Sequence, residues 1–217
     1  MITRSSTALA FLLGSFVLSG CASTYYNALE NIGIEKRELL VRRVDSARDA
    51  QSGAQEEFKD ALEQYRALVS FDGGELAKTY DRLSSQYDRL EGEAKLVRSR
   101  IDGIENVGSA LFREWREELN AYSSPDLRRR SEAQLRETER RYEQVLTAMN
   151  IAADRMDPVL TIFGDQVLFL KHNLNARAIA GLDAELATIE SRVDALIREM
   201  DKAIAEAEAF IASMPDA

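Results

Sequence analysis

The sequence predicts an all-α protein: an elongated antiparallel bundle, or coiled coil, of about four long helices that run up, down, up and down. Three observations predict it. Apolar residues recur at alternating steps of four and three, only three of the 217 residues are proline, and turn-forming residues cluster near positions 72, 124 and 174. Helices joined by short turns lie antiparallel. The pattern leaves open two separate hairpins, a three-helix bundle with a bent last pair, and a dimer of open hairpins.

The most regular repeat runs from Leu76 to Tyr122. An apolar period of 3.5 residues keeps one stripe facing its partners when helices supercoil, and 1.5 Å per residue makes this helix about 70 Å long. The other segments must therefore lie alongside it. Its seam consists of Leu76, Tyr80, Leu83, Tyr87, Leu90, Ala94, Val97, Ile101, Ile104, Gly108, Leu111 and Trp115.

Three more seams have the same rhythm, and we expect helices of similar length. The first, before the turn at Gly73-Gly74, is Leu40, Val44, Ala47, Gln51, Ala54, Phe58, Ala61, Tyr65 and Leu68. The third is Leu135, Thr138, Tyr142, Val145, Met149, Ala152, Met156, Val159, Phe163, Gln166 and Leu170. The fourth is Leu182, Leu186, Ile189, Val193, Leu196, Met200, Ala203, Ala207 and Phe210.

The turns carry recognisable start and stop signals. Paired glycines break the helix at 73 and 74, where Asp72 can cap the next one. Near Glu118 the phase of the second seam shifts, and Ser124 with Pro125 then has the form of a helix start. Pro158 lies inside the third helix, where a proline removes a backbone hydrogen bond, so we expect a bend there.

Residues 1–20 differ in kind from the rest. Arg4 supplies a positive charge, residues 8–17 are apolar or small, and Leu-Ser-Gly precedes Cys21. The apolar run is too short for a permanent membrane span, so it is interpreted as a signal peptide. Its end resembles the bacterial lipoprotein box, which implies removal of residues 1–20 and lipidation of Cys21. A plain secretory signal would instead leave a free thiol.

The expected mature chain has residues 21–26 as a short membrane-proximal linker and 27–217 as one long-helix domain. Without Arg4 it carries 27 Lys+Arg against 37 Asp+Glu. This negative surface argues against nucleic acid as a partner, and membrane attachment would depend on acyl chains. Ala22 rather than Asp after the cysteine implies the periplasmic face of the outer membrane. Tyr25 and Tyr26 suit either the membrane interface or a staple at the helix start.

No reaction is predicted. Cys21 is the only cysteine and His172 the only histidine, which argues against nucleophilic catalysis and a metal site. No phosphate-binding GxxxxGK loop occurs. We therefore expect a protein that is not an enzyme, with no catalytic residues, no metal and no cofactor.

The most apolar stretch of the mature chain is 158–174. Its apolar residues extend around most of the helix, so it is either buried core, the interpretation we favour, or partly exposed for a partner. His172 and its neighbours could form a polar ligand pocket, although turn chemistry explains the asparagines more simply. The candidate interaction surface consists of Phe163, Gln166, Phe169, Lys171, His172, Asn173, Asn175 and Arg177, together with Trp115.

One stretch is locally basic, with six arginines between 128 and 141. It could bind phosphate-bearing lipid or polymer, and the turn before it would lie near the membrane end. Because glutamates interleave with these arginines, a mixed-charge solvated helix face is favoured.

Three blocks of residues resemble a known family. They are Gly33 to Val41 leading to Ala47–Gln51, then Phe112-Arg113-Glu114-Trp115 with Tyr122, and above all Asp165 to Ala180. They are similar to an uncharacterised bacterial coiled-coil family catalogued as a domain of unknown function, DUF2959, whose members often carry a lipoprotein signal. The resemblance implies a helical envelope protein and brings no reaction, ligand or catalytic residue.

These inferences predict a structural or interaction protein, a scaffold or adaptor, lipid-anchored in the cell envelope. Its partner would be an unknown envelope protein or a second copy of itself. The alternative is a periplasmic helical bundle that binds a lipid or a small anionic or hydrophobic ligand, with His172, Asn173, Asn175 and Arg177 at the mouth.

Overall fold

The computed structural model describes residues 35–70, 76–173 and 176–214, without the side chains of Leu76, Thr79 and residues 176–181. Within these ranges the chain forms α2 (Lys36–Val69), α3 (Leu76–Glu118), the short 3-10 helix η1 (Leu119–Ala121), α4 (Pro125–His172) and α5 (Ala176–Ser213). No strand occurs in these ranges. The helix boundaries fall at the predicted turns, and the all-α prediction is confirmed.

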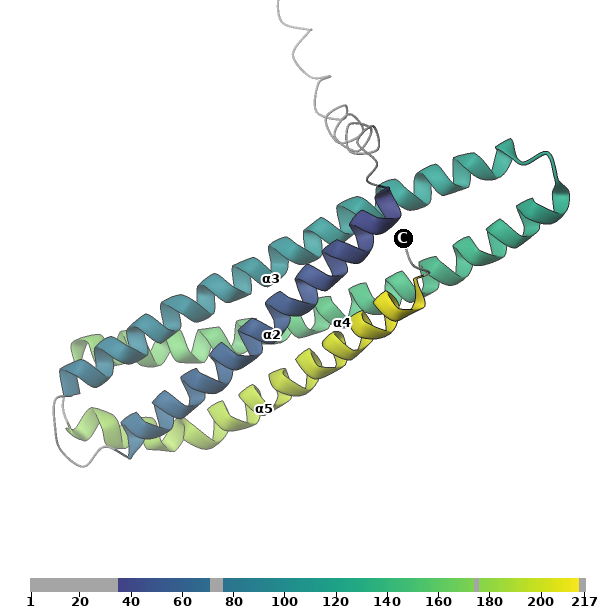
Figure 1. Ribbon diagram of the computed structural model, residues 1–217. Coiled ribbons are helices and arrows are strands. Elements are labelled where there is room, and N and C mark those ends of the chain that lie inside the picture. The colour runs from purple at the N-terminus through teal and green to yellow at the C-terminus, as the bar shows by residue number, and fades with distance from the viewer. Residues whose placement is uncertain (1–34, 71–75, 174–175, 215–217) are drawn as a thin grey trace, which may run out of the picture.

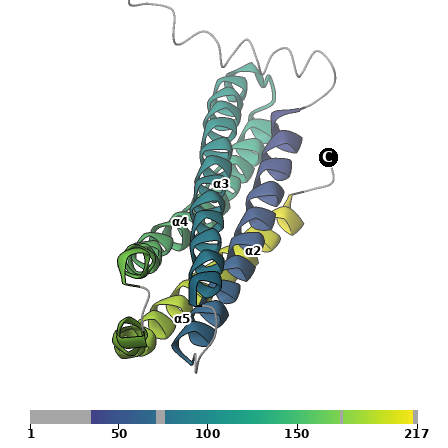
Figure 2. The same ribbon diagram turned by 90° about the vertical axis from the view of Figure 1, so that its left-hand side faces the viewer.

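The four long helices form one antiparallel bundle. Helix α2 packs against α3 and α5, and α4 packs against the same two helices. Successive helices run in opposite directions along the elongated molecule (Figure 1), and the view turned by 90° shows the same arrangement (Figure 2). The chain therefore forms a four-helix up-down-up-down bundle by itself, rather than two hairpins or three helices.

The predicted seams form the core. All nine seam residues of α2 are completely buried, from Leu40 to Leu68. Small residues such as Ala94 and Ala152 line the middle of the bundle, where they let the backbones approach closely. Towards the 70–75 turn the core is aromatic, and the rings of Tyr65 and Phe163 meet edge to face with centroids 5.9 Å apart. The other seams deviate mainly at half-buried residues, which are Tyr80, Tyr87, Trp115, Thr138, Tyr142, Gln166 and Leu186.

One polar residue occupies the α2 seam. Gln51 is completely buried, and its Nε2 donates to the backbone oxygen of Met149 on α4, 3.3 Å away. Its Oε1 has no hydrogen-bond partner among the residues that the structure describes. A buried polar group lowers stability but favours the one register in which it has a partner. Gln51 therefore ties the alignment of α2 to that of α4.

Glycine permits the closest contact between α3 and α4. The ring of Tyr142 lies over Gly108, where a Cβ atom would come within 2.4 Å of the ring, and Tyr87 lies over Gly164 in the same way, with its hydroxyl 2.9 Å from such an atom. Each of the two helices thus supplies one glycine and one tyrosine. A larger residue at either glycine would force the facing ring to move.

The helices differ in length, so the expectation of similar lengths is wrong. Helix α2 has 34 residues and α5 has 38, whereas α3 has 43 and α4 has 48. The ends of α3 and α4 therefore extend beyond the other two helices (Figure 1). We call residues 115–135 the projecting hairpin. It lies at the end where α2 begins and α5 finishes.

The hairpin turn has the predicted capping. Ser124 is the N-cap of α4, and its hydroxyl accepts a hydrogen bond from the backbone N–H of Leu127 at 3.4 Å. Pro125 is the first helical residue and Asp126 follows in the first turn, both favourable there. Helix α3 gives way to η1 at Leu119, where the phase of its seam shifts. Helix α4 continues through Pro158 to His172.

Candidate functional site

A cavity of about 330 Å³ lies in the corner where the first turn of α2 meets α3. It is lined by Glu35, Lys36 and Arg37 from the start of α2, and by Leu111, Glu114, Trp115 and Glu118 from α3. We call it the corner cavity. Within the described ranges, α3 continues beyond the start of α2 and leaves a step that none of the other described helices fills.

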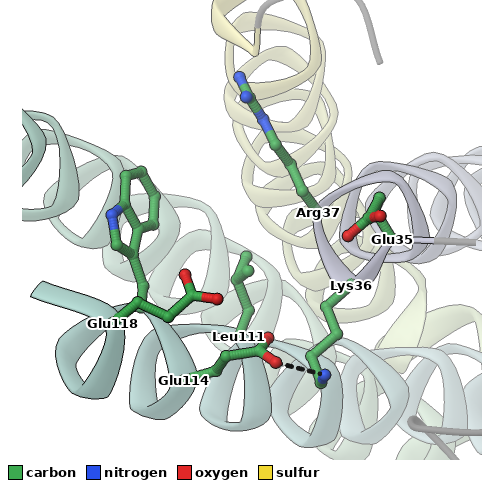
Figure 3. Close-up of a pocket in the computed structure, with 7 residues that line it drawn as sticks. Glu35, Lys36, Arg37, Leu111, Glu114 and Glu118 are labelled. Atoms are coloured by element: carbon green, nitrogen blue, oxygen red, sulfur yellow. Dashed lines mark hydrogen bonds and ion pairs between the residues drawn. The ribbon is translucent and has the colours of Figure 1, made fainter. Parts of the chain in front are cut away.

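The corner cavity is organised by an ion pair between the two helices. Lys36 is only 7% exposed, and its Nζ lies 3.0 Å from Oε1 of Glu114 (Figure 3). A buried ammonium needs such a partner because desolvation of an unpaired charge is costly. Arg37, the next residue, extends away from this pair (Figure 3). The ion pair therefore fixes how α2 starts against α3.

Trp115, at the base of the projecting hairpin, lines the corner cavity. Its indole Nε1 donates to the hydroxyl oxygen of Ser131 on α4 at 2.9 Å, and the side chain is half-buried against the core. Three carboxylates face two cationic side chains in this cavity. Its charge therefore suits a cation or a neutral polar group better than an anion.

The second candidate region is the opposite end of α4, close to the turn at 173–175. There Leu168 is 60% exposed and Phe169 45% exposed, and Lys171 and His172 are also exposed. We call these four residues the distal patch. Leu168 and Phe169 are neighbours in sequence, and both expose apolar side chains to solvent.

The distal patch revises two predictions. Stretch 158–174 is not wholly core, because Val159 and Leu170 are buried while Leu168 and Phe169 are not. Phe163, predicted as part of the interaction surface, is completely buried because its ring packs on Tyr65 across the core. Residues 167–170 are four consecutive apolar residues that point in different directions around the helix, so one inward-facing stripe cannot bury them all. The surplus therefore faces outwards.

The remaining predicted surface residues divide between the two ends. Gln166 is half-buried. Asn173 serves turn chemistry, since its Nδ2 donates to the backbone oxygen of Phe169 at 3.0 Å and its N–H to that of Leu170 at 3.1 Å. Trp115 lies beside Ser131, about 57 Å along α4 from Phe169 at 1.5 Å per residue. It therefore belongs to the corner cavity and not to the distal patch.

Five residues singled out from the sequence lie wholly or partly outside the described part of the structure. Cys21 and Asn175 lie outside the described residues, as do Tyr25, Tyr26 and the side chain of Arg177. Among the residues that are described, no group of three or more His, Cys, Asp or Glu side chains is placed to hold a metal ion. No helix in the described ranges is both long and apolar enough to cross a membrane.

The basic stretch separates into two parts. Arg136 pairs with Glu132, Arg140 and Arg141 pair with Glu137, and Arg116 of α3 pairs with Glu139. Hydrogen bonds from Arg140 and then Arg141 lower the pKa of Glu137 to about 2. This part is the mixed-charge helix face that the interleaved glutamates indicated. Arg128, Arg129 and Arg130 instead lie exposed at the end of the projecting hairpin.

Burial is the main cause of raised pKa values at three tyrosines, two of which lie at the contact between α3 and α4. It raises the pKa of Tyr142 to about 12, with Glu105 and Glu143 adding a smaller effect. Burial also raises the pKa of Tyr87, and a hydrogen bond to Glu91 adds to the shift. The pKa of Tyr65, whose hydroxyl donates to the backbone oxygen of Leu182 at 3.0 Å, is raised by burial as well. Each phenol is therefore neutral, as expected of a packing residue.

Fold and sites together define an antiparallel four-helix bundle with a corner cavity at one end and an exposed apolar patch at the other. A family model described as a protein of unknown function, DUF2959, matches residues 25–214, and the chain belongs to that family. No curated protein matches the chain, and no solved structure matches it. The match covers every helix described above.

Sequence reasoning missed the corner cavity. Lys36 and Glu114 are charged residues in stretches rich in charge, and nothing in their immediate neighbourhood indicates burial. The available signal was that two of the blocks resembling the family, 33–41 and 112–115, meet there. Their proximity depends on the offset between α2 and α3, which periodicity does not specify.

Proposed function

We propose that this protein is a lipoprotein of the cell envelope that works as a scaffold or adaptor and not as an enzyme. Cys21 would carry the lipid anchor at the periplasmic face of the outer membrane, and the bundle would hold the distal patch away from that membrane for a protein partner. At 1.5 Å per residue, the 48 residues of α4 span about 72 Å.

The observation that carries the proposal is that the start of α2 and the distal patch lie at opposite ends of the bundle. The chain leading from Cys21 joins the bundle at Glu35, just before α2, whereas the exposed Leu168 and Phe169 lie in the last turns of α4. The start of α2 and the end of α4 lie at opposite ends of the bundle (Figure 1). An apolar pair beside Lys171 and His172 has the composition of an interface anchor with a polar rim. A stiff bundle with its anchor at one end and its contact at the other suits an adaptor.

Anchoring is tested by replacing Cys21 in the full chain and fractionating bacterial cells. The unchanged protein should sediment with outer membranes and acquire radiolabelled palmitate, whereas Cys21→Ser should do neither. A serine variant that still fractionates with membranes, or an unchanged chain without label, would contradict the anchor.

Partner binding is tested with a photo-crosslinking residue at Phe169 and, in separate cells, at Lys171 or Trp115. Probes at the first two positions should give the same protein adduct, and the probe at Trp115 should not. Phe169→Glu should remove the adduct made from position 171. Ile151→Glu is the matched control, because Ile151 is 44% exposed on the same helix and should leave the adduct unchanged. Adducts that contain only a second copy would change the proposal to self-assembly.

A second candidate function is ligand binding, favoured by the corner cavity. Its volume is at the lower limit for small-molecule sites, and its excess of carboxylates beside an indole suits an organic cation. Native mass spectrometry of the soluble Cys21→Ser chain should then show a bound small molecule that is lost in Trp115→Ala. A ligand-free mass for the unchanged chain, purified without denaturant, would exclude this function.

A further inference from the structure

The projecting hairpin ends in an exposed tip, which we define as residues 119–131. Lys36 contacts Glu114, so η1 ends about seven residues, or about 10 Å, beyond the first turn of α2. On the other side, Phe210 of α5 lies beside Arg140 and Arg141, and α5 ends at Ser213. Neither α2 nor α5 therefore covers the tip.

The tip is held rigidly although only two helices form it. Leu119 and Leu135 are buried between α3 and α4, and Trp115 bonds to Ser131 across the same contact. Arg128 also donates to Oδ1 of Asn120 at 3.4 Å. The surface of the tip is thus preorganised before anything binds to it.

That surface combines apolar and cationic groups. Tyr122 is 42% exposed and Leu127 51% exposed. Around them, Arg128, Arg129 and Arg130 are all exposed. Their only acidic neighbour in the tip is Asp126, which pairs with Arg129, and Arg130 makes no hydrogen bond or ion pair within the described part of the chain. The tip therefore has a net charge of +2 on a chain whose net charge is −9.

We propose that the tip is a second membrane contact that rests on anionic phospholipid headgroups. Arginines attract the phosphates, while Leu127 and the tyrosine ring of Tyr122 enter the boundary between headgroups and acyl chains, where such side chains are favoured. The contact rests on the proposed function in one respect: the anchor at Cys21 brings the membrane to this end of the bundle.

Chain length allows both attachments at once. Fourteen residue steps separate Cys21 from Glu35, and at no more than 3.6 Å per residue they reach at most about 50 Å. The tip projects only about 10 Å beyond the start of α2. With two points of attachment, the bundle would be held at a defined orientation to the membrane and would not pivot about a single lipid anchor.

The test measures hydrogen exchange of residues 119–131 in the chain from Cys21 to Ala217, coupled through its only cysteine to a maleimide lipid. One set of vesicles contains phosphatidylcholine alone, and the other contains 30% phosphatidylglycerol. Each uncompensated basic residue should favour the anionic surface about five-fold, so the ratio of bound to free tip should be about 30-fold higher there. Exchange in the tip should be slower on the anionic vesicles, and exchange in residues 160–172 should be equal on both.

Two triple variants separate the tip from general charge. Arg128→Gln, Arg129→Gln and Arg130→Gln together should abolish the difference between the vesicles. The control, Lys59→Gln, Lys95→Gln and Lys202→Gln, removes the same charge from exposed positions of α2, α3 and α5 and should preserve it. Equal exchange of the tip on the two kinds of vesicle would overturn the proposal. So would a control variant that loses the difference between the vesicles as the arginine variant does. If protection of the tip from hydrogen exchange increased with the density of protein on neutral vesicles, the tip would contact a second copy of the chain instead of lipid.

Because the maleimide lipid replaces the biological anchor, this result does not depend on whether cells lipidate Cys21. A chain that fails the palmitate test could still show the contact at the tip, and a palmitoylated chain could lack it. The two failures are therefore distinguishable.

Discussion

In the four-helix section of the bundle a seam residue is enclosed by three other helices, whereas in the projecting hairpin it meets only one. Phe58 and Met149 in the first region are completely buried. In the second, Leu119 is 9% exposed and Leu127 is 51% exposed. The regular seams of α3 and α4 reach the projecting hairpin only at its base, at Trp115 and Leu135. The comparison shows that the pattern identifies which face is apolar, while the number of neighbouring helices determines how much free energy its burial contributes.

The largest effect should come from emptying the core of the four-helix section. Phe58→Ala is expected to lower the free energy of unfolding by about 3–5 kcal/mol, because the cavity it leaves is enclosed on all sides. Leu135→Ala, in the projecting hairpin, should cost about 2 kcal/mol, because its surroundings can collapse or admit water. Urea unfolding followed by circular dichroism measures both, and equal losses would contradict the comparison.

A smaller effect is expected where the two regions join. Gly108→Ala should destabilise the protein by about 1–3 kcal/mol, because the new methyl group displaces the ring of Tyr142. Gly92→Ala is the matched control on the same helix, since a Cβ there has no atom within 4 Å. It should stabilise the protein by about 0.5–1 kcal/mol through helix propensity. If both substitutions had the same sign, α3 and α4 would not be as close as described.

The contribution of the same junction to the stability of the protein should depend on pH. The folded state raises the pKa of Tyr142 from 10 to about 12, mainly by burial, so it favours the neutral phenol. This contribution is complete below pH 10 and is lost as the pH rises from 10 to 12. The melting temperature should therefore fall less for Tyr142→Phe than for the unchanged protein between pH 9 and 11.5. The exposed Tyr122→Phe should follow the unchanged protein, and parallel curves for all three would refute the assignment.

The smallest effect should come from the cap of the projecting hairpin. Ser124→Ala removes the hydrogen bond to the N–H of Leu127, which at 3.4 Å is long, so the loss should be about 0.5 kcal/mol. Hydrogen exchange should increase in residues 125–128 and stay unchanged in the four-helix section. Ser123→Ala is the control, because Ser123 is exposed and only precedes the cap. A global loss of protection would mean that the two regions unfold together.

The fold was largely predictable from the sequence. The nine seam residues of α2 are all completely buried, and Ser124 caps α4 as expected. Such features depend on residues a few positions apart, and 3.5-residue periodicity and capping chemistry act over that range.

The candidate sites were much less predictable. The sequence pointed to stretch 158–174 but placed Phe163 on the surface and favoured burial for the whole stretch. It also grouped Trp115 with residues at the opposite end of the bundle, because periodicity specifies a face of a helix and not a position along the axis. The corner cavity and the buried Lys36 had no local signal.

By itself, the sequence determined long amphipathic helices, their apolar seams and the turns between them, since each of these follows from local periodicity and short connections. Only the tertiary structure decided where each helix begins and ends relative to its neighbours. Those offsets arise from contacts between residues distant in sequence, such as Lys36 with Glu114, Gly108 with Tyr142 and Gln51 with Met149. They leave the corner cavity, the exposed tip and the distal patch at the ends of the bundle, where the packing of helices is incomplete.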